Sequence, residues 1–159
     1  MGTLMGYGDS LGDDAGKVRR EMKTRGLALV VEDDPALQRA MLAQLQADGF
    51  SVLGAYDYDT AVKHLSNNIP RVVCVDLGLP SESGFEVCEY IRKQAQLVTI
   101  PILVTSERSF PEDMAHAEEA GANAFLRKPF TMKRLMKYVG ALLDGPFGSR
   151  PSVRRLRVQ

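Results

Sequence analysis

Five short apolar runs, each followed by a segment of helical periodicity, restrict the fold of this sequence more than any other feature. The runs fall at residues 27–31, 50–55, 71–75, 100–104 and 123–127. The first and third lack polar alternation, which is typical of strands buried on both faces. Strands that alternate with helices predict an α/β fold with a parallel five-stranded sheet, covered by helices on both faces and joined by right-handed crossovers.

Prolines, capping residues and glycines mark where each predicted helix begins and ends. Gly49, Gly121 and Gly145 are the stop signals of the first, fourth and fifth helices. The predicted helix starts are, in order, Pro35, Asp57 or Asp59, Ser83 or Gly84, Pro111 and Thr131.

One domain over residues 26–144 accounts for all these elements. Residues 1–25 are expected to be an N-terminal extension, flexible or forming a short helix in which Val18 and Met22 dock on a partner. Residues 145–159 hold four arginines and no acidic residue, whereas residues 27–144 hold 11 basic and 16 acidic residues. We interpret this last segment as a basic C-terminal tail or linker, because no aromatic residues lie among its arginines.

A cytoplasmic location is expected for the chain. No apolar run reaches the roughly 20 residues that cross a bilayer, and the N-terminus has no secretory signal. Cys74 and Cys88 are too few for a disulfide framework, so both are expected to be reduced. We place Cys74 in the core and Cys88 at a partly buried helix position.

Carboxylate, hydroxyl and ammonium side chains follow four of the five predicted strands. The carboxyl ends of parallel strands meet at one edge of the sheet, where open α/β folds bind ligands. Carboxylates gathered there repel one another unless a cation is present, and oxygen ligands suit Mg²⁺. The residues are Glu32, Asp33 and Asp34 after the first strand, Asp76 after the third, Thr105 and Ser106 after the fourth, and Lys128 and Pro129 after the fifth.

Together these residues predict phosphoryl transfer to an aspartate. Asp76 would attack phosphorus once a cation neutralises the cluster, with Lys128 as a cation and the Thr105 hydroxyl as a donor. Each residue also has a purely structural interpretation. Asp76 and the acidic run could be caps, Thr105 a strand-end residue and Lys128 a solvated lysine. The functional interpretation is favoured because a suitable residue follows the first, third, fourth and fifth strands in turn.

Four segments strongly resemble the receiver domain of bacterial two-component response regulators, the CheY-like superfamily. They are LVVEDDPALQ, VVCVDLGLPSESGFEVC, IPILVTS and GANAFLRKPFT. The resemblance covers about residues 27–143. It implies a flavodoxin-like (βα)₅ doubly wound parallel sheet with strand order 2-1-3-4-5.

The resemblance also implies a role for each acidic residue of the site. Asp76 would be the phosphoacceptor. Asp33 would bind Mg²⁺ (or Mn²⁺) directly, together with Asp76 and the backbone carbonyl of Gly78. Glu32 would act largely through water, and Asp34 would belong to the start of the first helix.

Further roles carry over to the fourth and fifth strands. Lys128 would bind the phosphoryl group, and the Lys128–Pro129 peptide would be cis. Thr105 and Phe125 match the two switch positions, with Ser106 beside them. The face that changes would be the fourth helix, fifth strand and fifth helix, about residues 111–142.

Two positions are expected to set the lifetime of the phosphoryl group. Gly78, two residues after the acceptor, has no side chain to cover it, and Glu107, two after Thr105, lies near the same opening. Our hypothesis is that water access at this opening controls dephosphorylation.

The resulting prediction is a regulatory phosphoacceptor whose own chemistry is limited to phosphoryl transfer and autodephosphorylation. A histidine kinase or phosphotransfer protein would donate the group, and the altered domain would bind a downstream effector. No membrane contact is expected, and nucleic acid would be bound only through a domain that this sequence lacks. A homodimer formed on phosphorylation is left open, as is whether the chain is a single-domain regulator or a fragment.

Two other functions compete with this prediction. A haloacid dehalogenase-like phosphatase would need a second aspartate where Gly78 stands, so it is disfavoured. A receiver-like module that binds partners without phosphorylation is disfavoured by the intact Asp33, Asp76, Thr105 and Lys128. His64 and His116 are interpreted as solvated surface rather than phosphodonors. The methionines at core-like helical positions are Met41, Met114, Met132 and Met136.

Overall fold

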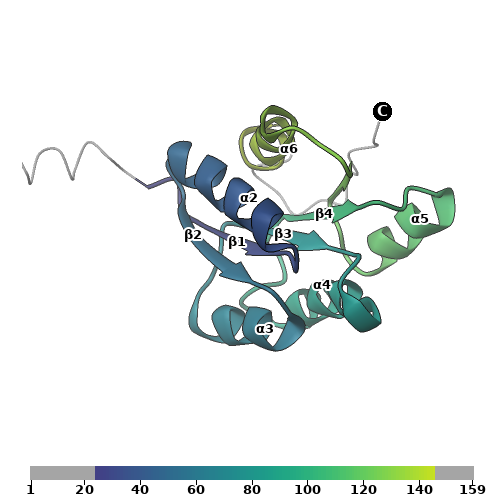
Figure 1. Ribbon diagram of the computed structural model, residues 1–159. Coiled ribbons are helices and arrows are strands. Elements are labelled where there is room, and N and C mark those ends of the chain that lie inside the picture. The colour runs from purple at the N-terminus through teal and green to yellow at the C-terminus, as the bar shows by residue number, and fades with distance from the viewer. Residues whose placement is uncertain (1–23, 146–159) are drawn as a thin grey trace, which may run out of the picture.

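The computed structural model describes residues 24–145, which form three layers with a parallel sheet in the middle (Figure 1). The strands are β1 (Leu27–Val31), β2 (Ser51–Ala55), β3 (Val72–Asp76), β4 (Ile102–Ser106) and β5 (Ala124–Arg127). Their order in the sheet is β2-β1-β3-β4-β5. The predicted α/β class and the 2-1-3-4-5 order are therefore confirmed.

Helices cover both faces of this sheet. They are α2 (Pro35–Ala47), α3 (Tyr58–Asn67), α4 (Ser83–Lys93), α5 (Pro111–Glu119) and α6 (Met132–Asp144), with a 3₁₀ turn, η1 (Pro80–Glu82), before α4. Helices α2 and α6 lie on one face, and α3, α4 and α5 lie on the other (Figure 1).

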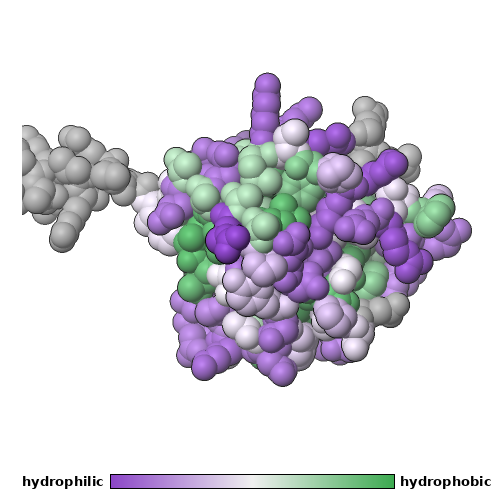
Figure 2. Space-filling model, in the orientation of Figure 1, coloured by the Kyte–Doolittle hydropathy of each residue, from purple (hydrophilic) through white to green (hydrophobic). Residues whose placement is uncertain are grey.

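Two hydrophobic cores follow from the alternation of side chains along each strand. In β1, Leu29 and Val31 belong to the core under α3, α4 and α5, whereas Ala28 and Val30 belong to the core under α2 and α6. Both cores need apolar residues, so consecutive strand positions are apolar. Figure 2 shows that hydrophilic side chains predominate on the surface, and that hydrophobic ones gather between α2 and α6 on the face shown.

Helix starts agree with the capping signals. The Asp34 carboxylate accepts a hydrogen bond from Ala36 N (2.9 Å), as expected for the start of α2. Of the two candidates for α3, Asp57 is the cap, with Oδ1 2.8 Å from Thr60 N. Thr131 caps α6, and α4 begins at Ser83.

Strand β4 lies two residues later than predicted. Pro101 has no N–H to donate to a sheet ladder, and the carbonyl of Ile100 is bound instead by Arg92 Nη1 at 2.7 Å. The strand therefore begins at Ile102, and Thr105 and Ser106 are its last two residues instead of following it. Similarly, β3 ends on Asp76 itself, which pairs with Thr105.

Two side-chain predictions are corrected. Cys88 is fully buried like Cys74, and burial raises the pKa of both thiols to about 12. His64 is half-buried, with Nε2 3.1 Å from the carbonyl oxygen of Gly54. His116 is exposed as predicted, and its ring stacks on Phe85 with centroids 3.9 Å apart.

Other predictions have simpler outcomes. Met41 is buried, and the methionines at 114, 132 and 136 pack against the cores. The possible helix with Val18 and Met22 and the basic tail lie outside the described residues. Between residues 24 and 145, no helix has the length and hydrophobicity needed to span a membrane.

Candidate functional site

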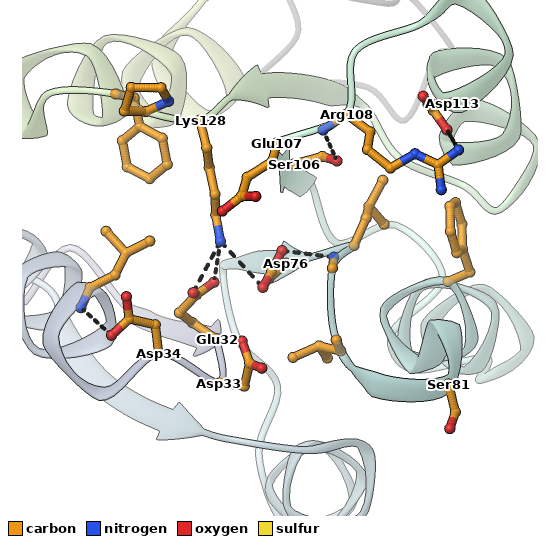
Figure 3. A pocket seen from close by; sticks show the side chains of 17 residues that line it. Glu32, Asp33, Asp34, Asp76, Ser81, Ser106, Glu107, Arg108, Asp113 and Lys128 are labelled. Atoms are coloured by element: carbon orange, nitrogen blue, oxygen red, sulfur yellow. Dashed lines mark hydrogen bonds and ion pairs between the residues drawn. The ribbon is translucent and has the colours of Figure 1, made fainter.

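Strand register brings the predicted site residues together at the carboxyl edge of the sheet. Val31 of β1 pairs with Val75 of β3, so Glu32 follows β1 beside Asp76. Asp76 pairs with Thr105 of β4. Ser106 pairs with Arg127 of β5, so Lys128 follows directly. Residues nearly a hundred positions apart thereby face one cleft (Figure 3).

Lys128 joins the two buried carboxylates at the centre of the cleft. Its Nζ lies 3.2 Å from Asp76 Oδ2 and donates to Glu32 Oε1 and Oε2 at 3.0 and 3.1 Å (Figure 3). Burial alone lowers the pKa of Lys128. The hydrogen bond with Glu32 and the charges of Asp76 and Glu32 outweigh burial, and the net pKa is raised. Lys128 is therefore a fixed cation of the site.

Three carboxylates gather at this site, and two of them, Glu32 and Asp76, contact the Lys128 ammonium. Ligand oxygens of Glu32, Asp33 and Asp76 all lie within 4.8 Å of one another. Glu32 and Asp76 are only 1% and 4% exposed. Burial, and then the charge of Asp76, raise the pKa of Glu32 from 4.5 to about 7. One lysine therefore does not balance the negative charge.

A divalent cation with oxygen ligands would relieve this imbalance. The three carboxylates form a compact oxygen donor set, partly buried and open to the cleft on the Asp33 side, which is exposed. Such hard ligands suit Mg²⁺ or Mn²⁺. The residues present therefore fit the metal that was predicted from the sequence.

The Asp76 carboxylate is held by the turn that follows β3. Gly78 N donates to Asp76 Oδ1 at 2.8 Å, and Leu77 N donates to the Thr105 carbonyl at 2.9 Å. A Cβ at Gly78 would lie 3.2 Å from Asp76 Oδ1. This side of the carboxylate is consequently close to any side chain placed at position 78.

The cleft has a volume of about 1010 Å³ and extends from the acidic cluster towards α5. Glu107 and Arg108 line it from the loop after β4. Arg108 reaches Asp113 of α5, with Nη2 3.4 Å from Oδ1, and its backbone N–H donates to Ser106 Oγ at 3.0 Å (Figure 3). Ser106 thus anchors the loop that borders the cleft.

The remaining predicted residues occupy the fourth and fifth strands. Thr105 is 1% exposed, at the end of β4. Phe125 of β5 is buried in the core under α3, α4 and α5. The Lys128–Pro129 peptide is cis, and Pro129 and Phe130 line the cleft wall.

Two residues that support the site were missed by sequence reasoning. Gly84, in the first turn of α4, lies against the end of β3, where a Cβ would overlap the carbonyl oxygen of Asp76. Gln38, buried on α2, donates to the carbonyls of Glu32 and Ala55. The only sequence signals were a glycine in the first turn of a helix and a polar residue on an apolar helix face.

Comparison with known proteins identifies the class to which this fold and site belong. The profile of the family described as "Response regulator receiver domain" matches residues 28–140. The chain therefore belongs to this family, whose domains are generally regulatory rather than classical enzymes.

Particular relatives agree with this family. The chain is 30% identical over 115 residues to the phosphate regulon transcriptional regulatory protein PhoB of Escherichia coli, covering 72% of this chain and 50% of that protein. It is 35% identical over 115 residues to the response regulator MprA of Mycobacterium sp. (strain KMS), with 72% and 49% covered. The chain thus spans about half the length of the curated relatives it matches.

Solved structures show the same fold. Chemotaxis response regulator CheY4 of Vibrio cholerae superposes with a TM-score of 0.72 and 28% identity, covering 76% of this chain and all of that one. The receiver domain of sensor histidine kinase PA1611 from Pseudomonas aeruginosa gives a TM-score of 0.68 at 26% identity, covering 75% and 98%. That structure has a magnesium ion coordinated in its active site cleft.

Proposed function

We propose that this chain is a phosphorylation-dependent signalling switch, and that Asp76 accepts the phosphoryl group. The observation that carries the proposal is the surroundings of Asp76. It ends a central strand at 4% exposure, 3.2 Å from the Lys128 ammonium and within 4.8 Å of two further carboxylates. A carboxylate that only capped a turn would need neither partner.

Phosphoryl transfer would proceed by attack of one Asp76 oxygen on the phosphorus of a phosphohistidine. The new P–O bond forms as the P–N bond breaks, and the imidazole leaves with the electron pair of that bond and a proton from solvent. Glu32, Asp33, Asp76 and the Gly78 carbonyl would hold Mg²⁺ (or Mn²⁺). When bound, this ion neutralises the carboxylates and charge on the phosphoryl oxygens.

The other site residues would orient the phosphoryl group. Lys128 already lies against Asp76 and would pair with a phosphoryl oxygen, which adds negative charge at the same place. The Thr105 hydroxyl and the neighbouring Ser106 would donate hydrogen bonds from the end of β4. These groups would contribute positioning and charge stabilisation rather than covalent chemistry.

We propose that the signal leaves through α5, β5 and α6. Movement of Thr105 towards the phosphoryl group would draw Phe125 and the loop after β4 with it. This movement would change the affinity of the α5–β5–α6 face for an effector protein or for a second copy of the chain. Autodephosphorylation would reset the switch when water attacks phosphorus and Asp76 leaves, at a rate set by Gly78 and Glu107.

The phosphodonor would be a histidine kinase or a phosphotransfer protein, and the chain would act in the cytoplasm. We further propose that residues 26–144 are the receiver domain, with residues 1–25 as an extension and residues 145–159 as a basic tail. Any nucleic-acid binding would require a further domain.

Intact-mass measurement tests this proposal directly. The protein is incubated with Mg²⁺ and acetyl phosphate, beside an Asp76→Asn variant that has nearly the same shape but no nucleophilic carboxylate. A labile adduct of one phosphoryl group, lost in the variant, is the expected result. If folded protein binds Mg²⁺ and forms no adduct, a phosphorylation-independent binding module replaces the proposal.

A further inference from the structure

The buried side-chain amide of Gln38, on α2, is hydrogen-bonded to the carboxyl ends of the two strands next to the acidic cluster. Gln38 is 4% exposed. Its Nε2 donates to the carbonyl of Glu32 at 3.0 Å and to that of Ala55, the last residue of β2, at 2.9 Å. A buried amide is costly unless it is hydrogen-bonded, and here both protons of the amide are used.

These hydrogen bonds help to hold the backbone of Glu32 in place. Glu32 N donates to the Ala55 carbonyl at 3.0 Å, and its own carbonyl accepts from Gln38. Both backbone polar groups of Glu32, its N–H and its carbonyl, are therefore hydrogen-bonded at the point where β1 ends. The carboxylates of Glu32 and Asp33 extend from this hydrogen-bonded segment and lie close to Asp76.

We propose that Gln38 is a positioning residue for the cation site. It holds the Glu32–Asp33 segment so that both carboxylates stay within reach of an ion shared with Asp76. The inference rests on the proposed function, because it concerns the Mg²⁺ of that same site. Gln38 itself contacts neither the ion nor the acceptor, and acts only through the backbone of Glu32.

Gly54 of β2 leaves the space that this arrangement requires. A Cβ at position 54 would lie 2.7 Å from Gln38 Oε1 and 2.9 Å from its Cδ, with Leu42 Cδ1 at 3.1 Å. Any side chain at this position would push the Gln38 amide away from the two carbonyls. Substitutions at positions 54 and 38 should therefore affect the cation site through the same contact, so that their effects are not additive.

Gln38→Leu tests the proposal, with Gln46→Leu on the exposed side of the same helix as the matched control. Mg²⁺ affinity is measured by titration calorimetry, and amide hydrogen exchange of Glu32 by NMR in the metal-free protein. We expect Gln38→Leu to weaken Mg²⁺ binding about 10-fold, the lower end for lost outer partners of metal ligands. Exchange at Glu32 should be faster, and Gln46→Leu should change neither.

These readouts separate positioning from simple stabilisation of α2. A merely structural Gln38 would lower the free energy of unfolding but leave the Mg²⁺ affinity of the folded fraction unchanged, and that result would overturn the proposal. A wild-type chain that binds no Mg²⁺ would instead overturn the proposed function as well. The two failures are therefore distinguishable.

Gly54→Ala gives an independent test that leaves Gln38 in place, and it also serves if Gln38→Leu does not fold. Alone, it should weaken Mg²⁺ binding by a similar factor. Combined with Gln38→Ala, which empties the space beside position 54, it should add little. If Gly54→Ala weakened Mg²⁺ binding equally in the wild-type and Gln38→Ala backgrounds, the coupling between positions 54 and 38 would be contradicted.

Discussion

Glu32 should destabilise the metal-free protein at neutral pH, and Glu32→Gln should remove this effect. The folded site raises the pKa of this carboxyl from 4.5 to about 7, through burial and then the charge of Asp76. In the unfolded chain the group ionises near its ordinary value. Between these two pH values the folded state holds a proton that the unfolded state has lost.

The sign of the pH dependence follows from this difference. Because the folded state binds more protons in the window, stability falls as pH rises from about 4.5 to about 7. At about 1.4 kcal/mol per pKa unit, the loss is of the order of 3 kcal/mol above pH 7. Glutamine resembles the protonated acid, so Glu32→Gln should not show the loss of stability caused by ionisation of Glu32.

Urea unfolding in EDTA, followed by far-UV circular dichroism because the chain has no tryptophan, measures this effect. Wild type and Glu32→Gln should have similar stability near pH 4.5. The variant should be more stable by roughly 3 kcal/mol at pH 8. Comparing the two chains cancels the titration of groups they share, and Glu89→Gln on the exposed surface is the control.

Mg²⁺ provides a second arm of the same experiment. At pH 8, saturating Mg²⁺ should raise the free energy of unfolding of the wild-type protein, because the ion supplies positive charge that Lys128 alone does not. A stability difference between wild type and Glu32→Gln that stays flat from pH 4.5 to 8 would refute the reasoning.

Four further predictions concern packing, backbone freedom and access of water to the site. Gly84→Ala should destabilise by about 1–3 kcal/mol, because its Cβ would overlap the Asp76 carbonyl. In Gly140→Ala, whose Cβ would meet nothing within 4 Å, urea unfolding should show a gain of up to about 1 kcal/mol. Arg92→Ala should cost about 3 kcal/mol in the same assay through lost bonds to buried carbonyls, with Mg²⁺ affinity retained. Gly78→Asn should slow loss of the phosphoryl adduct, followed by intact mass, and an unchanged rate would contradict control by water access.

Local signals in the sequence were sufficient for most elements of the fold. Apolar runs located all five strands, most clearly β1 and β3, which are buried on both faces, and caps such as Asp34 and Thr131 located helix starts. The start of β4 was only partly visible in the sequence, through Pro101. It also depends on Arg92, in the last turn of α4, which binds the carbonyl of Ile100 in place of a neighbouring strand.

The candidate site divides in the same way. Carboxylate, hydroxyl and ammonium groups at strand ends are visible in a sequence, and the family resemblance supplied their roles and the strand order. Gln38 and Gly84 carry no such chemical signature. Their importance arises from atoms of Ala55 and Asp76 that approach them only in the folded chain.

The sequence by itself therefore determined the alternation of strands and helices and the chemical types gathered at one edge of the sheet. These depend on the spacing of near neighbours. Only the tertiary structure decided that Lys128 bridges Glu32 and Asp76, that the Glu32 carboxyl is destabilised in its charged form, and that Gln38 fastens the segment carrying it. Distances, burial and charge balance are set by strand register and by helix packing between residues far apart in the chain.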